Sequence, residues 1–348
     1  MKRGVILISA LIILFAASCG NGEPVSSSVP SATDTTAPQN TQMPTPTELE
    51  TLVYSMDYSA EPTPIPTPIP TPTAEPTEEP TPTPYGLCGT RFEGRFTDGD
   101  IVDKKNSFKS KDIDITITKV ADDRRTGDPL TYFVVDIFVQ NIECLRTYFA
   151  GGSFGNRTAS ATSISKELGA LLAISGDSVE TRSGGLIVRN GEVLRTKIID
   201  KWDACVLYKD GTMQCYSPQD TYVDAILQKE PWQTWSFGPM LLDSVGAPMR
   251  EFNLPDSISA RNPRAAIGYY EPGHYCLVLV DGRQSGYSQG MTLIELSKLM
   301  YDLGCRAAYN LDGGETVRLL YHDKLVNSPT GNRNLRDVIY LVPTEVNP

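Results

Sequence analysis

Residues 276–314 read CLVLVDGRQSGYSQGMTLIELSKLMYDLGCRAAYNLDGG, and this stretch decides which fold we expect. It reads as an apolar strand, a glycine-rich loop, a helix and a second apolar strand. The helix, Thr292–Leu303, is the strongest one predicted, because Thr292 and Glu295 can form a capping box and Gly304 can end it. A strand–helix–strand unit of this kind predicts a sheet with a helix packed on one face.

An aspartate follows each of these two strands. If the strands are parallel, Asp281 and Asp312 emerge at the same edge of the sheet, where the helix also begins at Thr292. The strand spacing predicts a separation of roughly 5 Å on adjacent strands, or roughly 10 Å with one strand between them. Both separations suit a pair of carboxylates that cleaves a glycosidic bond. Asp-Gly is also a common turn dipeptide, so two plain turns are the alternative interpretation.

The rest of the C-terminal region reads mostly as strands. Residues 85–348 are enough for one large domain, and we expect an α+β fold with a mixed β-sheet and a few helices. Weaker helices are expected at 163–168 and at 221–228, the second capped by Asp220. Alternation or β-branched residues predict strands near 113–120, 132–140, 171–175, 186–189, 193–199, 205–216, 265–270, 276–281, 307–311, 317–321 and 338–342.

The first 19 residues resemble a lipoprotein signal peptide. Lys2 and Arg3 precede an apolar run at 5–17, which is short for a membrane span, and small residues lead to Cys19. We expect cleavage before Cys19, lipidation of its sulfur, and a protein anchored to the extracellular face of a bacterial membrane through that lipid alone. An ordinary secretory signal is the alternative interpretation.

Residues 20–84 have the composition of a tether. They hold 15 of the 26 prolines and 9 acidic residues but no Lys or Arg, which predicts a disordered, extended segment. A spacer is the usual role of such a segment, and recognition by a partner domain is the alternative. The chain has a net charge of −11 and no basic tract, so we expect no nucleic-acid partner.

Six cysteines follow Cys19, and none has the spacing of zinc ligands, so no metal site is expected. Only Cys205 and Cys215 can be tested by strand register. A two-residue Asp210-Gly211 turn would place the two cysteines out of register, whereas a three-residue loop that also includes Lys209 would place them opposite each other. The sequence allows both registers.

Seven motifs together resemble the phosphodiester glycosidase family. The resemblance runs from about residue 113 to residue 342, in the order that the family has. The motifs are ALLAISGD (170–177), GLIVRNG (185–191), WSFGPML (235–241), NPRAAIG (262–268), VLVDGRQSGYSQGMTLIEL (278–296), LGCRAAYNLDGG (303–314) and LRDVIYLV (335–342).

The resemblance implies an α+β fold that hydrolyses a sugar-1-phosphodiester, with an envelope glycan or sugar phosphate as substrate. No cofactor is expected, and a divalent ion stays an open alternative. The expected catalytic carboxylates are Asp177, Asp281 and Asp312. The expected substrate-binding residues are Arg264, Arg283, Thr292, Asn310, Gly313, Gly314, Glu315 and Thr316, of which Arg264 and the helix start at Thr292 would hold the phosphate.

This sequence departs from the family pattern in three motifs, and the departures include Ser175 in place of an asparagine and Val317 in place of a serine. Ser178 replaces an aromatic residue after Asp177, and Ala265 replaces a threonine. Glu315 stands where the family has a third glycine, so its charge is expected to repel a phosphate. Two hypotheses follow: an envelope-anchored hydrolase, or a catalytically lapsed domain of the same fold that binds glycan.

Overall fold

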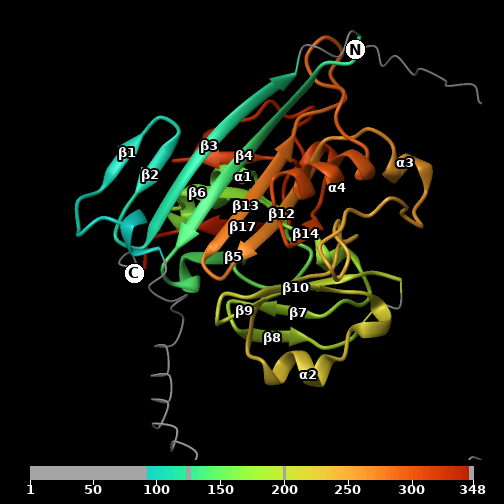
Figure 1. Ribbon diagram of the computed structural model, residues 1–348, viewed down its shortest axis with the longest axis horizontal. Coiled ribbons are helices and arrows are strands. Elements are labelled where there is room, and N and C mark those ends of the chain that lie inside the picture. Colours follow the sequence, from blue (N-terminus) through green and yellow to red (C-terminus); the bar gives the residue numbers. More distant parts are fainter. Residues whose placement is uncertain (1–91, 123–126, 199–200, 345–348) are drawn as a thin grey trace, which may run out of the picture. The chain divides into compact units, whose positions relative to one another are not determined.

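The computed structural model describes residues 92–122, 127–198 and 201–344 (Figure 1). The predicted signal peptide 1–19, including Cys19, and the predicted tether 20–84 lie outside the described residues. The described residues all belong to one compact unit, Glu75–Pro348. Within this part of the chain, no helix is long and apolar enough to cross a membrane.

The largest sheet has seven strands in the order β1-β2-β3-β4-β13-β12-β14. Every neighbouring pair in it is antiparallel. Its strands are β1 (Val102–Lys104), β2 (Ser107–Lys109), β3 (Ile113–Asp122), β4 (Leu130–Val139), β12 (Arg264–Glu271), β13 (His274–Val280) and β14 (Ala307–Asn310).

A second sheet has five strands in the order β16-β15-β6-β17-β5, again antiparallel throughout. Helix α1 (Ala161–Leu168) covers one of its faces, since Ile164 packs with Ala173 and Val338. The strands are β5 (Leu145–Phe149), β6 (Leu172–Ser175), β15 (Leu319–Tyr321), β16 (Lys324–Leu325) and β17 (Asp337–Leu341).

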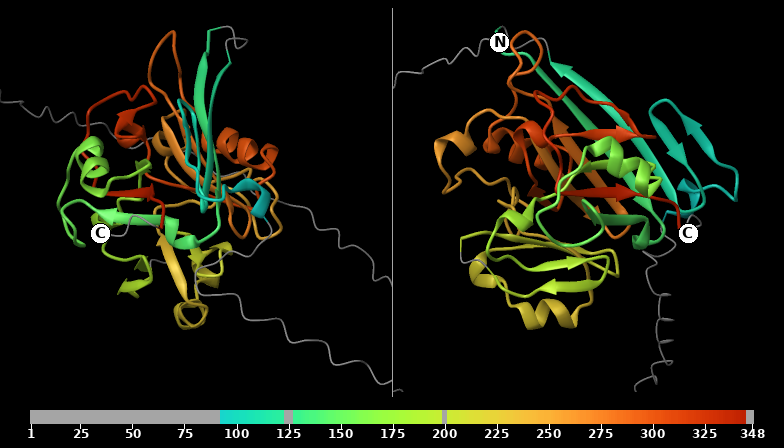
Figure 2. Two further views of the ribbon diagram at one scale, coloured as in Figure 1. Left: turned by 90° about the vertical axis from the view of Figure 1, so that its left-hand side faces the viewer. Right: turned by 180° about the vertical axis from the view of Figure 1, so that it is seen from behind.

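The two sheets pack face to face around one apolar core. Val135 and Leu277 from the seven-stranded sheet share this core with Ile174 and Ile339 from the five-stranded sheet. Helix α4 (Leu293–Asp302) covers the other face of the large sheet. The resulting layers are α4, the seven-stranded sheet, the five-stranded sheet and α1, and they can be followed in the two views of Figure 2.

Helix α4 forms as the sequence predicts. The Thr292 hydroxyl accepts a hydrogen bond from the Glu295 N–H at 3.1 Å, and the Glu295 carboxylate accepts one from the Thr292 N–H at 3.0 Å, which completes the capping box. Leu296 and Met300 are fully buried one turn apart against the sheet.

A smaller group of strands lies beside the end of the large sheet. It comprises a three-stranded sheet in the order β10-β9-β11 and the hairpin β7-β8, and the Thr234 hydroxyl joins the two by accepting the Val188 N–H at 2.8 Å. The elements are β7 (Ile187–Arg189), β8 (Glu192–Arg195), β9 (Ala204–Tyr208), β10 (Met213–Tyr216), β11 (Pro231–Trp235) and α2 (Val223–Gln228), with α3 (Asp256–Ser259) further along the chain.

The expected α+β class is confirmed. Strands β13 and β14 are both antiparallel to β12, which lies between them, so they run parallel to each other as second neighbours. β13 and β14 therefore run in the same direction without pairing with each other. Every pair of neighbouring strands among the described residues is antiparallel. Residues Asp281 and Asp312 consequently leave the sheet at the same edge, with one strand between them.

Two local expectations need correction. Helix α2 begins after Tyr222 and is not capped by Asp220, because the Asp220 carboxylate accepts the Ser217 hydroxyl at 2.6 Å within its own turn. The sequence did not predict five of the strands, namely β1, β2, β5, β11 and β16. All five residues of β11 are buried, so its sequence has no polar and apolar alternation that would reveal a strand.

The register of the cysteine pair is resolved. Cys205 lies directly opposite Cys215, and Tyr208 donates its N–H to the Thr212 carbonyl at 2.8 Å, so the three-residue loop is the one that forms. Both thiols are free. A second pair, Cys276 and Cys305, has its sulfur atoms 3.6 Å apart and is also free. A Cβ on Gly268 would lie within 2.7 Å of both of these sulfurs, so only glycine leaves them room to meet.

Candidate functional site

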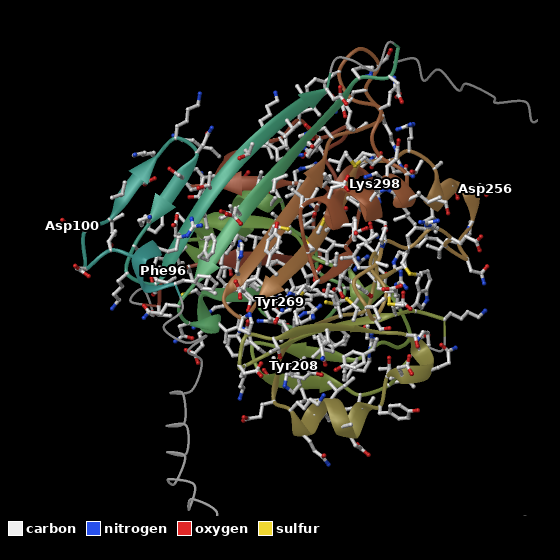
Figure 3. All side chains as sticks on the ribbon, viewed as in Figure 1. Phe96, Asp100, Tyr208, Asp256, Tyr269 and Lys298 are labelled. Atoms are coloured by element: carbon white, nitrogen blue, oxygen red, sulfur yellow. The ribbon has the colours of Figure 1, made fainter. Side chains whose placement is uncertain are left out.

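A pocket of about 210 Å³ lies where β14 ends and β12 begins. Segments from α3, the β13–α4 loop and the β16–β17 loop complete its walls, and Asp256 at the start of α3 marks this side of the molecule in Figure 3. Seven of the predicted site residues line this pocket: Arg264, Arg283, Asn310, Asp312, Gly313, Gly314 and Glu315.

The glycine turn after β14 allows two backbone segments to approach closely. A Cβ on Gly313 would lie 2.8 Å from the Pro263 carbonyl oxygen, and Gly314 has a φ of 70° while donating its N–H to the same oxygen at 3.0 Å. A side chain at Gly313 would push this turn away from the start of β12, and a side chain at Gly314 would be strained by the positive φ. The turn thereby fixes Asp312, which precedes it, in the pocket wall.

Asp312 is the most deeply buried carboxylate that lines the pocket. Burial raises its pKa above the usual range of aspartate, and the Ser178 hydroxyl, which donates to its Oδ2 at 2.7 Å, partly offsets that rise. A partly buried carboxylate with a raised pKa, facing a pocket, has the properties of a general base or acid.

Asn310 presents an unpaired acceptor in the same wall. Its side chain is 2% exposed, and its Nδ2 donates to the Gly238 carbonyl at 2.9 Å. Its Oδ1 is buried and has no hydrogen-bond partner among the described residues. Buried polar atoms are nearly always paired, so this oxygen is an unused hydrogen-bond acceptor in the residue that lines the pocket.

Arg264 is engaged within the protein, which differs from the expected role of holding a phosphate. Its guanidinium donates to the carbonyls of Ile258 and Ala260, each at 2.6 Å, and to that of Met291 at 2.9 Å. Burial, followed by the charge of Arg283, lowers its pKa to about 10. We conclude that Arg264 holds the wall of the pocket in place and contributes positive charge from behind it.

Arg283 is the more accessible cation. It has a φ of 57°, and its Nη2 donates to Asn262 Oδ1 at 2.7 Å. A Cβ on Gly314 would lie 3.6 Å from both of its terminal nitrogens, so the guanidinium lies over the glycine turn. Among the described residues no carboxylate forms an ion pair with it.

Glu315 forms an ion pair at the pocket, so part of its negative charge is offset within the protein. Its Oε2 lies 3.1 Å from Arg333 Nη2, and the two side chains are 42% and 61% exposed. Arg333 also lines the pocket and is not among the residues predicted from the sequence. It comes from the loop before β17, where no strand pattern or glycine motif points to a site.

Asp281 shares the sheet edge with Asp312 but does not line the pocket. It is 1% exposed and accepts three hydrogen bonds, from Asn327 Nδ2 at 2.8 Å, the Tyr287 hydroxyl at 2.8 Å and the Ser328 N–H at 3.0 Å. Burial raises its pKa, and these hydrogen bonds partly offset the rise. Its contacts hold the loop after β16 in place.

Asp177 is also placed behind the pocket. It is fully buried, forms an ion pair with Arg189 at 2.7 Å and accepts the Ser236 N–H at 2.8 Å. Arg189 also contacts Asp337, which accepts the N–H of Ser178 at 2.9 Å. This buried cluster therefore fixes the backbone of Ser178, whose hydroxyl contacts Asp312.

Glu180 adjoins the same cluster and was not identified from the sequence. Burial raises its pKa to about 7. Both of its carboxylate oxygens are buried with no hydrogen-bond partner among the described residues, but it does not line the pocket.

The two remaining predicted residues support the backbone. The Thr292 hydroxyl is part of the capping box of α4, and the N-terminus of this helix is already occupied by the Glu295 carboxylate. The Thr316 hydroxyl donates to the Gly313 carbonyl at 2.8 Å and thus stabilises the glycine turn. Neither residue lines the pocket.

A larger cavity of about 590 Å³ lies at the opposite ends of β12 and β14, where Tyr269 is labelled in Figure 3. Met213, Met240 and Met249 line it, and none of the predicted site residues does. Within the described residues, no group of three or more His, Cys, Asp or Glu side chains is arranged to hold a metal ion.

The chain belongs to the phosphodiester glycosidase family, whose sequence model matches residues 168–342. This is a family of hydrolases, and the match includes every residue of the pocket. The match begins at residue 168, later than the resemblance expected from about residue 113, and therefore leaves out β3 and β4.

Part of this chain is similar in sequence to a known protein. It is 29% identical over 126 residues to the SPbeta prophage-derived uncharacterized protein YomE of Bacillus subtilis (strain 168), a stretch that covers 36% of this chain and 19% of that protein. The chain thus matches about a fifth of the length of this relative.

Two solved structures have a similar fold. One is the zebrafish N-acetylglucosamine-1-phosphodiester alpha-N-acetylglucosaminidase catalytic domain auto-inhibited by its pro-peptide, with a TM-score of 0.52, 20% identity, and coverage of 67% of this chain and 84% of that one. The other is a hypothetical protein from Synechocystis, with a TM-score of 0.52, 15% identity, and coverage of 68% and 64%. At these identities the likeness concerns the fold alone.

Proposed function

We propose that this protein hydrolyses a sugar-1-phosphodiester at the anomeric carbon, with Asp312 as the catalytic carboxylate. The observation that carries the proposal is the pocket at the end of β14, where Asp312 and the unpaired Oδ1 of Asn310 lie with the guanidinium of Arg283. A carboxylate, a sugar-hydroxyl acceptor and a phosphate-binding cation are the three groups that this reaction needs. Membership of the phosphodiester glycosidase family supports the same reaction.

In the proposed reaction Asp312 accepts a proton from the water that attacks the anomeric carbon. Its raised pKa makes it a stronger base than an exposed aspartate. The bond between the anomeric carbon and the phosphate oxygen breaks, and the phosphate leaves as a monoester with the electron pair of that bond. A phosphate needs little protonation to leave, so a second carboxylate acting as acid contributes less than in an ordinary glycosidase. Arg283 stabilises the charge that develops on the leaving phosphate.

The test is to incubate the full-length protein with a panel of sugar-1-phosphodiesters and to measure the release of free sugar and phosphomonoester. Asp312→Asn should lower kcat by about two to four orders of magnitude. The matched control, Asp302→Asn, removes an exposed carboxylate that pairs with Lys298 on α4, and it should leave kcat unchanged. Binding of a sugar phosphodiester without any product would instead support the lapsed, glycan-binding alternative.

We further propose that the protein works at the extracellular face of a bacterial membrane, where a lipid on Cys19 anchors it. The features that support this are the basic residues Lys2 and Arg3, the apolar run at 5–17 and the small residues before Cys19. The proline-rich segment 20–84 would then separate the domain from the membrane and give it access to envelope glycans or sugar phosphates.

A further inference from the structure

The charges around the pocket are nearly balanced. Three arginines and two carboxylates line it, so one net positive charge is left when Asp312 is ionised. The charges of Arg264 and Arg283 are not paired with a carboxylate of the described residues. The third arginine, Arg333, is paired with Glu315 at 3.1 Å.

Hydrogen bonds to the backbone hold together the two segments that carry Glu315 and Arg333. The buried side chain of Arg318 donates to the Glu315 carbonyl at 2.8 Å and to the Gly331 carbonyl at 2.6 Å, so it clamps the two segments together. A Cβ on Gly331 would lie 3.0 Å from Glu315 Cγ, which means that the loop passes directly against the glutamate side chain. The backbone of Glu315 is therefore held against the loop that carries Arg333, and the two side chains meet at the pocket.

We propose, building on the proposed hydrolysis, that the Glu315–Arg333 pair makes this pocket selective for a phosphate with a single negative charge. The one net positive charge of the pocket, with Arg283 as its more accessible cation, matches the one negative charge of a phosphodiester. A phosphomonoester is mostly a dianion at pH 7.5, because its second pKa is about 6. Glu315 repels the second charge and also occupies Arg333, the group that would otherwise bind it.

This selectivity has a direct consequence for the reaction. Hydrolysis converts a monoanionic diester into a monoester that carries more negative charge. The pocket thus binds its product less tightly than its substrate, and the product is released rather than retained as an inhibitor.

The experiment compares methyl phosphate, a monoester, with dimethyl phosphate, a diester, in NMR titrations of the full-length protein at pH 7.5. The measured quantity is the ratio of the two affinities, because this ratio cancels effects that are common to both ligands. In the wild type, dimethyl phosphate should bind more tightly. Glu315→Gln should raise the relative affinity for methyl phosphate by about five- to tenfold, since the repulsion disappears and Arg333 becomes available.

Two further variants distinguish an effect of charge on the affinity ratio from an effect of damage to the fold. Arg333→Gln leaves Glu315 unpaired and should shift the ratio further against methyl phosphate. The double variant Glu315→Gln/Arg333→Gln removes the repulsion but also the cation that would bind the second charge, so its ratio should lie between those of the wild type and Glu315→Gln. Asp302→Asn, which removes one carboxylate from the exposed Lys298 pair, is the matched control and should leave the ratio unchanged.

An unchanged ratio in Glu315→Gln would overturn the proposal, and so would a wild type that binds neither probe. A wild type that binds both probes with the expected ratio but cleaves no sugar phosphodiester would count against the hydrolysis alone. The charge selectivity and the proposed function can therefore fail separately.

Discussion

Ser178 shows how a single departure from a family pattern can be accommodated. Its hydroxyl donates to Asp312 at 2.7 Å, and its N–H is held by Asp337 at 2.9 Å. A hydrogen bond to the ionised form of a carboxyl group lowers its pKa, and this offsets part of the rise that burial causes. The residue that replaces an aromatic side chain thus adjusts the proposed base.

The first prediction concerns Ser178→Ala. Without the hydroxyl, the pKa of Asp312 should rise further, because only the ionised form gains from that hydrogen bond. If Asp312 acts as a base, kcat/KM increases as pH rises through its pKa, so the acid limb of the pH profile should move to higher pH. At pH 8 the change in kcat/KM should be less than about threefold.

The control is Ser163→Ala, which removes an exposed hydroxyl on α1. A shift of the acid limb to lower pH would show that Ser178 stabilises the protonated form instead. A pH profile that does not move would mean that Asp312 is not the group that limits activity at low pH.

For Asp281, the role that the family resemblance implies differs most clearly from the role that its position in the structure supports. The family resemblance suggests a catalytic carboxylate, but both of its oxygens accept hydrogen bonds within the protein, from Asn327, Ser328 and Tyr287. Asp281→Asn should therefore lower the free energy of unfolding by about 1–3 kcal/mol, since an amide nitrogen cannot accept the hydrogen bonds that one carboxylate oxygen accepts now.

Thermal or denaturant unfolding measures that loss, and kcat should fall far less than in Asp312→Asn. A variant that unfolds like the wild type but loses as much activity as Asp312→Asn would establish a catalytic role for Asp281.

At the scale of elements, the sequence predicted most strands and the capping box of α4, because those features depend on local patterns. It could not show that β12 lies between β13 and β14, since pairing between distant segments leaves no local pattern. The same limit applies to the site. Asp312 and the glycine turn could be predicted from their own neighbourhood, whereas Arg333 reaches the pocket only through the packing of a loop.

The third prediction concerns the start of α4. Thr292→Ala should remove the capping box and lower the free energy of unfolding by about 1 kcal/mol, which corresponds to a Tm about 2–4 °C lower. Binding of dimethyl phosphate should not change, because Thr292 does not line the pocket. A clear loss of phosphate affinity at unchanged stability would restore the original expectation that the helix start holds the phosphate.

At the scale of the whole molecule, the family match does not account for the complete sheet. Strands β3 and β4 precede residues 168–342, yet β4 pairs with β13 along seven residue positions. The last residue of β13 leads directly to Asp281 and the Arg283 loop. Segments outside the matched region therefore support one wall of the pocket, although none of them lines it.

The fourth prediction concerns the part of the chain before the described residues. In a bacterial host that processes lipoproteins, the wild type should partition into the detergent phase and incorporate radiolabelled fatty acid. Cys19→Ser should abolish the label, because no other thiol follows the apolar run at that distance. Cys205→Ser, at a buried cysteine of the domain, is the matched control and should keep the label. A wild type that is secreted freely and unlabelled would exclude the lipid anchor.

The absence of a side chain at Gly268 has a consequence for the oxidation of two cysteines. Because this residue has no side chain, the sulfurs of Cys276 and Cys305 face each other across β12 at 3.6 Å. In an oxidising compartment, a disulfide donor could take two electrons and two protons from this pair and join β13 to the turn after α4. Chains folded inside and outside the cell would then differ by the mass of two hydrogen atoms at this pair. The oxidation state of these two sulfurs would then be a chemical marker of the compartment in which each copy of the chain was folded.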